Sequence, residues 1–288
     1  MNKFYDKLFA GITYSAAFFT IASLVGIILS IVTEGIPIFE KVGVFSALFD
    51  LEWRPVDDPP IFGMFSLIVS SIYVTLGTLI VAIPLGLGSA IYISELAGRR
   101  TKEIIKPIIE LLAGIPSVIY GLVGIVFLSP FLMNTFDLPT GLNLFSASLI
   151  LGIMVVPIIS TMSEDALNAV PQNLRDASFS LGANKFETIF KVVIPAAKSG
   201  IVGSFILAFG RAIGETLVVL MIAGGAAQIP KSVFAPVRPM TAAIAAEMGE
   251  TVVGSDHYSA LFAIAIILFL ITFFSNIITE LVFFRNKK

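Results

Sequence analysis

An arginine and a glutamate interrupt a long apolar stretch in the last third of the chain, within the sequence Gly-Arg-Ala-Ile-Gly-Glu-Thr at 210–216. If this stretch is helical, the four-residue spacing places Arg211 and Glu215 on one face, close enough to pair. A guanidinium offers planar, paired donors to an oxyanion, and a carboxylate accepts a hydrogen bond from a protonated oxyanion but repels a fully deprotonated one. With Thr216 beside them, the two residues predict either a path for an oxyanion or a neutral structural pair that docks two helices.

Other kinds of chemistry lack the residues that they need. The chain has no cysteine and one histidine, so disulfides, thiolate metal sites and histidine-rich metal sites are excluded. No G-x-x-x-x-G-K-[ST] sequence is present to cradle the phosphates of ATP. We therefore expect no enzyme activity, no metal and no cofactor, and any ATPase that drives transport must be a separate subunit. The formal net charge of −2 argues against a nucleic-acid partner.

The composition is typical of a helical membrane protein. Hydrophobic residues make up 57% of the 288 residues and charged residues 13%, and the mean hydropathy is +0.97, whereas a soluble domain has about 25% charged residues. Long uncharged runs favour helices over the short alternating segments of a β-barrel. Counting residues between charges predicts five spans, and one further stretch is as apolar but is interrupted by Arg211 and Glu215. Each of the six can cross a hydrocarbon core of roughly 30 Å. They are about 9–32, 66–93, 108–132, 144–168, 200–223 and 259–282.

The distribution of lysine and arginine predicts the orientation of these spans. With the N-terminus inside, the inner segments hold 13 of these residues and the outer segments hold four, so we expect both termini in the cytoplasm. The first span has 26 uncharged residues, longer than the h-region of a cleaved signal peptide, and is interpreted as a membrane helix. In the outer segments, 33–60 and 224–258, Trp53 is expected to anchor at the membrane interface and His257 to lie in a solvated loop.

A second polar anomaly is the inner loop at about 171–195, between the fourth and fifth predicted spans. Apolar residues recur at helical spacing on both sides of Gly182, and glycine is common where a helix ends in a chain reversal. The pattern predicts a short helix, a turn and a second helix that leads back into the membrane. From the pattern alone, the loop could lie on the lipid surface or dock onto a cytoplasmic partner.

The same loop resembles the signature of ABC-importer permeases, Glu-Ala-Ala-x3-Gly-x9-Ile-x-Leu-Pro. Asp-Ala-Ser at 176–178 corresponds to the first triplet, Gly182 to the turn, and Val192, Ile194 and Pro195 to the end, with both spacings kept. The resemblance implies that the loop is a coupling helix seated in a cleft of the ATPase. The residues that it assigns to ATPase coupling are Asp176, Ala177, Ser178, Phe179, Leu181, Gly182 and Ala183.

Most of 52–283 also resembles the PstC-type permeases of bacterial phosphate ABC importers, a group within the binding-protein-dependent transport inner membrane component family. The stretches that carry this resemblance are 63–95, 110–121, 176–195, 210–216 and 241–248. It implies an all-α, six-helix protein of the bacterial cell (inner) membrane. A type I (MetI-like) permease core at 61–288 would follow an extra N-terminal helix and outer loop at 1–60.

The resemblance also implies the partners and the substrate. In this family the permease forms a heterodimer with a sister permease and works with two ATP-binding subunits and an extracytoplasmic phosphate-binding protein. Arg211, Glu215 and Thr216 would then line the path of inorganic phosphate. Two alternatives stay open within this class, the sister permease itself and a permease for another oxyanion such as sulfate or molybdate. A secondary anion transporter, a channel or a membrane-embedded enzyme would be alternatives of a different class.

Overall fold

The computed structural model describes the backbone of residues 3–285 and the side chains of residues 9–278 and 281. The segments named η are π-helical and continue the helices that precede them. The elements in chain order are α1 (Lys3–Val42), α2 (Val44–Phe49), β1 (Trp53–Arg54), β2 (Ile61–Phe62), α3 (Phe65–Ile91), η1 (Tyr92–Leu96), α4 (Arg99–Gly114), α5 (Ser117–Val123), η2 (Gly124–Leu128), α6 (Ser129–Phe136), α7 (Leu144–Asn168), α8 (Gln172–Ser180), α9 (Lys185–Thr188), η3 (Ile189–Val193), α10 (Ile194–Ala196), α11 (Lys198–Ile213), α12 (Leu217–Ile222), α13 (Met240–Glu247) and α14 (Asp256–Arg285).

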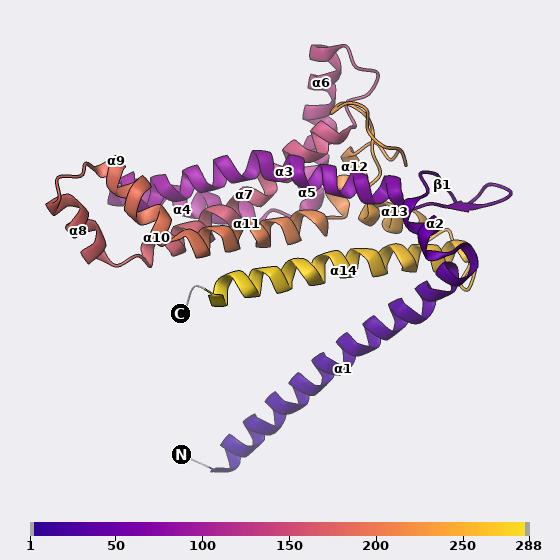
Figure 1. Ribbon diagram of the computed structural model, residues 1–288, viewed down its shortest axis with the longest axis horizontal. Helices are drawn as coiled ribbons and strands as arrows, with labels where there is room; N and C mark the ends of the chain where they lie inside the picture. The colour runs from indigo at the N-terminus through magenta and orange to yellow at the C-terminus, as the bar shows by residue number, and fades with distance from the viewer. Residues whose placement is uncertain (1–2, 286–288) are drawn as a thin grey trace.

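The long helices α3, α7, α11 and α14 run along one direction, whereas α1 runs obliquely to them and α6 projects from the side of the bundle (Figure 1). The helices α8 and α9 lie at one end, and α2 and the antiparallel β1–β2 hairpin lie at the other. The helix α1 meets α14 near the hairpin end and then diverges from the bundle. The start of α1 and the end of α14 point toward the end of the bundle that carries α8 and α9. This agrees with the prediction that both termini lie on one side of the membrane. That this side is the cytoplasm stays a prediction.

The centre of the bundle is the pair α3 and α7, which pack along most of their lengths. Glycines allow this close approach. A Cβ atom on Gly77 would lie 2.3 Å from the Ser148 hydroxyl, and one on Gly152 would lie 2.8 Å from the Val81 side chain. Small residues at helix contacts are the main device by which membrane helices approach closely, because lipid gives apolar side chains no reason to associate.

A separate apolar cluster joins the end of α1, the hairpin, α13 and α14. Its buried members include Ile38, Ala47, Trp53, Phe62, Met240 and Leu261. The expectation that Trp53 anchors at the membrane interface is wrong, because its side chain is 5% exposed and packs on Phe62 and His257. The outer segment 33–60 is therefore folded onto the later helices.

Within the part of the chain that the structure describes, five helical segments are long and apolar enough to cross a membrane, or six if a bent pair is counted as one span. The predicted spans 66–93, 144–168 and 259–282 are confirmed by Phe65–Leu96, Leu144–Asn168 and Asp256–Ile278. The first span is longer than predicted, because its helix continues past Glu34 and ends at Gly43, where φ is +88°.

The third predicted span, 108–132, is wrong in its boundaries. The helix α4 ends at Gly114, and the apolar segment begins only at Ser117. The cause is Pro116, which lacks a backbone N–H and disfavours helical geometry at the residue before it, so Ile115 is extended (ψ 127°). The charge-rich segment 99–110 thus belongs to α4, a helix separate from the apolar segment that starts at Ser117.

The fifth predicted span, 200–223, is not one continuous helix. The helix α11 ends at Ile213 and α12 begins at Leu217, so residues 214–216 form a break. On its other side, α11 follows the segment Lys185–Ala196 after a bend of 69°. The helix is therefore interrupted at the residues singled out for oxyanion chemistry.

Candidate functional site

Arg211 and Glu215 lie on the two sides of the broken helix. Arg211 is in the last turn of α11, and Glu215 is in the break before α12. Their closest charged atoms, Nη2 of Arg211 and Oε2 of Glu215, are 4.0 Å apart. The Arg211 side chain is 56% exposed, whereas that of Glu215 is only 7% exposed. The carboxylate is therefore held inside the fold while the guanidinium faces out of it.

The break supplies Glu215 with partners that hold it in place. Its Oε1 accepts a hydrogen bond from the Val218 N–H at 3.4 Å, and its backbone carbonyl accepts one from the Thr241 hydroxyl at 2.7 Å. The Thr216 hydroxyl donates to the carbonyl of Gly214 at 3.4 Å. The three residues predicted for the pathway are thus brought together at one point, and their contact with a substrate stays a prediction.

The face of α11 that carries Arg211 is open in this chain. A Cβ atom on Gly210 would meet nothing within 4 Å, and one on Gly214 would meet only the Gly210 carbonyl, at 3.4 Å. Gly210 and Gly214 are four residues apart, a spacing of small residues that lets another helix approach closely, and no helix among the described residues covers them. Leu207, Leu217 and Leu220 are also exposed around it, so this face can receive a second molecule.

The inner loop folds as predicted into two helices joined at Gly182. Gly182 has a φ of +88°, which favours glycine, and its N–H donates to the Phe179 carbonyl at 2.9 Å. The next N–H, that of Ala183, donates to the Ser178 carbonyl at 3.2 Å, which completes a Schellman cap. Asn184 and Glu187 then form a capping box that starts α9. Local sequence therefore fixes both the end of α8 and the start of the returning helix.

The outer side of this helical turn is apolar and unprotected. Leu181 is 89% exposed, and Leu174 and Phe179 are also exposed. A groove of about 520 Å³ runs along the turn. Its lining includes Leu174, Ala177, Leu181, Gly182, Ala183 and Lys191. On the inner side, the buried hydroxyls of Ser178 and Thr188 lie 2.9 Å apart and join α8 to α9. Of the residues predicted for coupling, Ser178 thus has an internal role, and Phe179 and Leu181 form part of the exposed surface.

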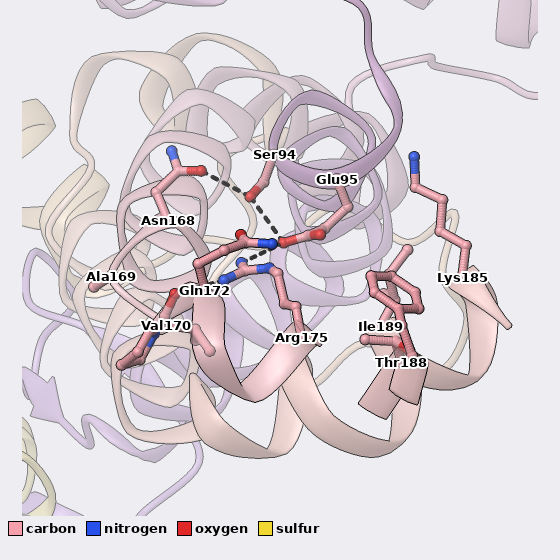
Figure 2. Close-up of a pocket in the computed structure, with 12 residues that line it drawn as sticks. Ser94, Glu95, Asn168, Ala169, Val170, Gln172, Arg175, Lys185, Thr188 and Ile189 are labelled. Carbon is pink, nitrogen blue, oxygen red and sulfur yellow. Dashed lines mark hydrogen bonds and ion pairs between the residues drawn. The ribbon is translucent and has the colours of Figure 1, made fainter. Parts of the chain in front are cut away.

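A part-buried ion pair attaches α8 to η1, which continues α3, at the edge of a groove of about 560 Å³ (Figure 2). Nη2 of Arg175 lies 2.7 Å from Oε1 of Glu95, and the two side chains are 12% and 10% exposed. The same guanidinium donates to the backbone carbonyls of Val170, at 2.5 Å, and Leu167, at 3.0 Å. Arg175 therefore caps the end of α7 and connects α8 to η1 at once. Sequence reasoning counted Arg175 only as an inner positive charge and did not identify this role.

Further hydrogen bonds extend this connection to α4. The Ser94 hydroxyl donates to Asn168 at 2.9 Å, and the amide of Asn168 donates to Glu164 at 3.3 Å. Lys106 of α4 pairs with Glu164 at 3.2 Å, and Lys102 donates to the Ser94 carbonyl at 2.9 Å. Charged residues next to predicted spans were the available signal for this network, but they did not show which residues would pair.

A second cluster lies at the hairpin end and centres on Glu247. Its carboxylate accepts hydrogen bonds from Trp53 Nε1 at 3.0 Å and Arg238 Nη1 at 2.5 Å, and it contacts His257 Nε2 at 2.8 Å. The expectation of a solvated loop histidine is wrong, because His257 is in the first turn of α14 and its side chain is only 17% exposed. The sequence could not show that Trp53 and Glu247 meet, because 194 positions separate them.

Comparison with known proteins decides the class of this molecule. The profile of the family described as the binding-protein-dependent transport system inner membrane component matches residues 82–288. The chain belongs to this family. This binding-protein-dependent permease is 34% identical over 278 residues to a probable ABC transporter permease protein, YqgH, of Bacillus subtilis (strain 168), covering 96% of this chain and 90% of the relative. It is 35% identical over 287 residues to the phosphate transport system permease protein PstC of Mesorhizobium japonicum, covering 93% and 86%.

Solved structures share the fold of the permease. It matches a chain of the inward-facing MetNI methionine ABC transporter with a TM-score of 0.54 and 21% identity, over 76% of this chain and 94% of that chain. A chain of a bacterial alginate ABC transporter matches with a TM-score of 0.66 and 14% identity, over 98% and 99%. The prediction of an all-α, multi-pass MetI-like permease of the inner membrane is thereby confirmed.

Proposed function

We propose that this permease is the PstC-type subunit of an ATP-driven importer of inorganic phosphate. The observation that carries the proposal is the exposed Arg211 guanidinium, held 4.0 Å from the buried Glu215 carboxylate at a helix break. A charged side chain near the bilayer centre costs roughly 2.5–3.5 kcal/mol on insertion scales. A guanidinium turned out of an apolar bundle must therefore meet something polar, and a passing oxyanion satisfies that need. Relatives named as phosphate permeases support inorganic phosphate as this anion.

The position of Arg211 suits a site within the membrane. It is 13 residues from the start of α11, which corresponds to roughly 20 Å along a helix. Transporters commonly bind substrates near the midplane at broken helices, where the chain leaves room for polar contacts. In the proposed mechanism Arg211 binds the phosphate oxygens, Glu215 accepts a hydrogen bond from a protonated phosphate, and Thr216 lines the same path.

The open face around Gly210 and Gly214 supports the predicted heterodimer. A sister permease that packs near this face would cover the exposed leucines and place a second wall opposite Arg211. The permease core at 61–288 would then contribute half of the path, and the N-terminal helix and outer loop at 1–60 would pack against its outer end.

The inner loop supports the predicted role of two ATP-binding subunits. The exposed apolar turn at Phe179 and Leu181 offers the surface that an ATPase cleft would cover, together with Asp176, Ala177, Gly182 and Ala183. Closure of the ATPase dimer on ATP would move α8, and the Arg175–Glu95 ion pair would carry this movement to α3. The path would then open toward the phosphate-loaded extracytoplasmic binding protein, and ATP hydrolysis would reset it.

The proposal is tested by uptake into proteoliposomes that hold the complete importer. We expect ATP-dependent uptake of radiolabelled inorganic phosphate that requires this chain and is not reduced by a tenfold excess of sulfate or molybdate. Transport of sulfate or molybdate in place of phosphate would overturn the substrate. Uptake without ATP and without the ATP-binding subunits would overturn the class of transporter.

A further inference from the structure

The short helix α13 is fixed at its first turn to α3 and to the break between α11 and α12. The backbone N–H of Met240 donates to the Ser71 hydroxyl of α3 at 2.8 Å, in a buried position. The Thr241 hydroxyl donates to the backbone carbonyl of Glu215 at 2.7 Å, and both residues are buried. The first turn of α13 therefore holds the residue whose carboxylate pairs with Arg211.

The last residue of α13 is fixed to the outer elements. Glu247 receives Trp53 from β1, Arg238 from the segment before α13 and His257 from the first turn of α14. Arg238 also donates through Nε to the Gly225 carbonyl at 2.7 Å, so the cluster reaches the segment that follows α12. Hydrogen bonds to a charged group are stronger than neutral ones. We call these four residues the Glu247 cluster.

The helix α13 lies between the two attachments, at the end of the bundle that carries the hairpin (Figure 1). Its eight residues span roughly 12 Å as a rigid helix. A displacement of the hairpin or of the start of α14 must therefore move α13 as a unit, and the movement reaches the Glu215 carbonyl through Thr241. The break at 214–216 has no continuous helix to resist such a shift.

We infer that Thr241 is a positioning residue for Glu215, and that the Glu247 cluster connects this position to the outer surface. In this arrangement, docking of the binding protein on the hairpin end sets the geometry of the Arg211–Glu215 pair. The inference rests on the proposed function, because it assigns a role within the same phosphate path. Thr241 and the Glu247 cluster do not touch the substrate in this proposal. They act through the backbone of Glu215, which does.

The first test removes one hydroxyl. In proteoliposomes with the complete importer, Thr241→Val should lower the maximal rate of phosphate uptake about tenfold or more, because a misplacement of about 1 Å is enough for such an effect. Thr241→Ser keeps the hydroxyl and should stay within about twofold of the wild type. Thr251→Val is the matched control, since the Thr251 hydroxyl also donates to a backbone carbonyl, that of Met248 at 3.1 Å, but outside α13. A Thr241→Val rate equal to that of Thr251→Val would overturn the inference.

The second test asks whether the two ends of α13 act together. Glu247→Gln should lower, severalfold, the ratio of ATP hydrolysis with loaded binding protein to ATP hydrolysis without it. If α13 transmits the signal, the double variant Thr241→Val with Glu247→Gln should have the same ratio of ATP hydrolysis as the more severe of the two single variants. A double variant whose loss in this ratio equals the product of the two single losses would overturn the connection between Glu247 and Glu215 through α13, which we call the relay.

The outcomes separate this inference from the proposed function. Co-purification of the ATP-binding and sister subunits shows in each case that the complex is assembled. If Arg211→Gln abolishes phosphate uptake while Thr241→Val and Glu247→Gln leave it unchanged, the proposed function stands and the relay is wrong. If assembled Arg211→Gln importers take up phosphate normally, the phosphate path itself is wrong, and the relay fails with it.

Discussion

Arg175 and Glu95 lie 80 positions apart in the chain, yet their side chains form a 2.7 Å, part-buried ion pair. The pair joins the first helix of the inner loop to the end of a membrane span. Because Arg175 also holds two carbonyls at the end of α7, three elements meet at one guanidinium. The guanidinium therefore ties α8 to both central helices.

Removing one partner of the Arg175–Glu95 pair should lower the stability of the folded permease. Glu95→Gln leaves the part-buried Arg175 without its counter-charge, and such a loss costs about 1–3 kcal/mol, less than for a fully buried pair. We expect a lower midpoint of thermal unfolding of the purified complex. The double variant Glu95→Gln with Arg175→Gln should lose less than the sum of the single variants. Glu103→Gln is the control, because the Arg99–Glu103 pair is exposed and contributes little. Equal unfolding midpoints for Glu95→Gln and Glu103→Gln would contradict the prediction.

Replacement of Arg211 should abolish transport without loss of the complex. Arg211→Gln removes the charge and the paired donors that bind an oxyanion. Phosphate uptake by proteoliposomes should therefore fall by at least about a hundredfold, the scale on which an enzyme loses rate when one oxyanion-binding donor is removed. Arg211→Lys keeps the charge and should retain a measurable fraction. Arg99→Gln, at an exposed arginine, should transport as well as the wild type. Normal uptake by Arg211→Gln would remove this residue from the path.

Replacement of Glu215 should change the choice of anion. A carboxylate accepts a hydrogen bond from a protonated phosphate and repels an anion that carries no proton, such as sulfate at neutral pH. Glu215→Gln should therefore make phosphate uptake more sensitive to competition by sulfate. The inhibition constant for sulfate, measured in both proteins, checks this. An unchanged constant would leave Glu215 with only its structural pairing to Arg211.

Replacement of Gly182 should separate the ATP-binding subunits from the membrane subunits. Gly182 has a φ of +88° and lies in the exposed turn between α8 and α9, so Gly182→Trp strains the turn and places a large ring on the docking surface. We expect loss of ATPase co-purification. Gly98→Trp is the matched control, because Gly98 also has open space around it but a φ of −69°. Retention of the ATPase by Gly182→Trp would count against docking at this turn.

The sequence predicts spans well where charges bound an apolar run, as at Leu144–Asn168, because charged residues mark where a helix leaves the hydrocarbon. It predicts spans poorly where the backbone itself ends a helix. Pro116 stops α4 without changing the count of uncharged residues. The break at 214–216 coincides with the charged Glu215, but a charge inside an apolar stretch does not show whether the helix continues through it.

The candidate site shows the same division between local and long-range information. The charges of Arg211 and Glu215 stand out because an apolar segment makes any ion costly, and the turn at Gly182 follows from local cap residues. The contacts of Arg175 with Glu95 and of Trp53 with Glu247 depend on helices that meet only in the tertiary structure. No spacing in the chain predicts them.

The uncovered strip that bears Gly210, Arg211 and Gly214 has a consequence for how cells must make this protein. If the proposed sister permease covers this strip, a copy inserted without it would hold a cation against acyl chains, which is costly. Such an orphan is a natural target for membrane proteolysis. Synthesis of the two permeases should therefore be matched in amount, and expression of this chain alone should give a short-lived product that co-expression of its companion rescues.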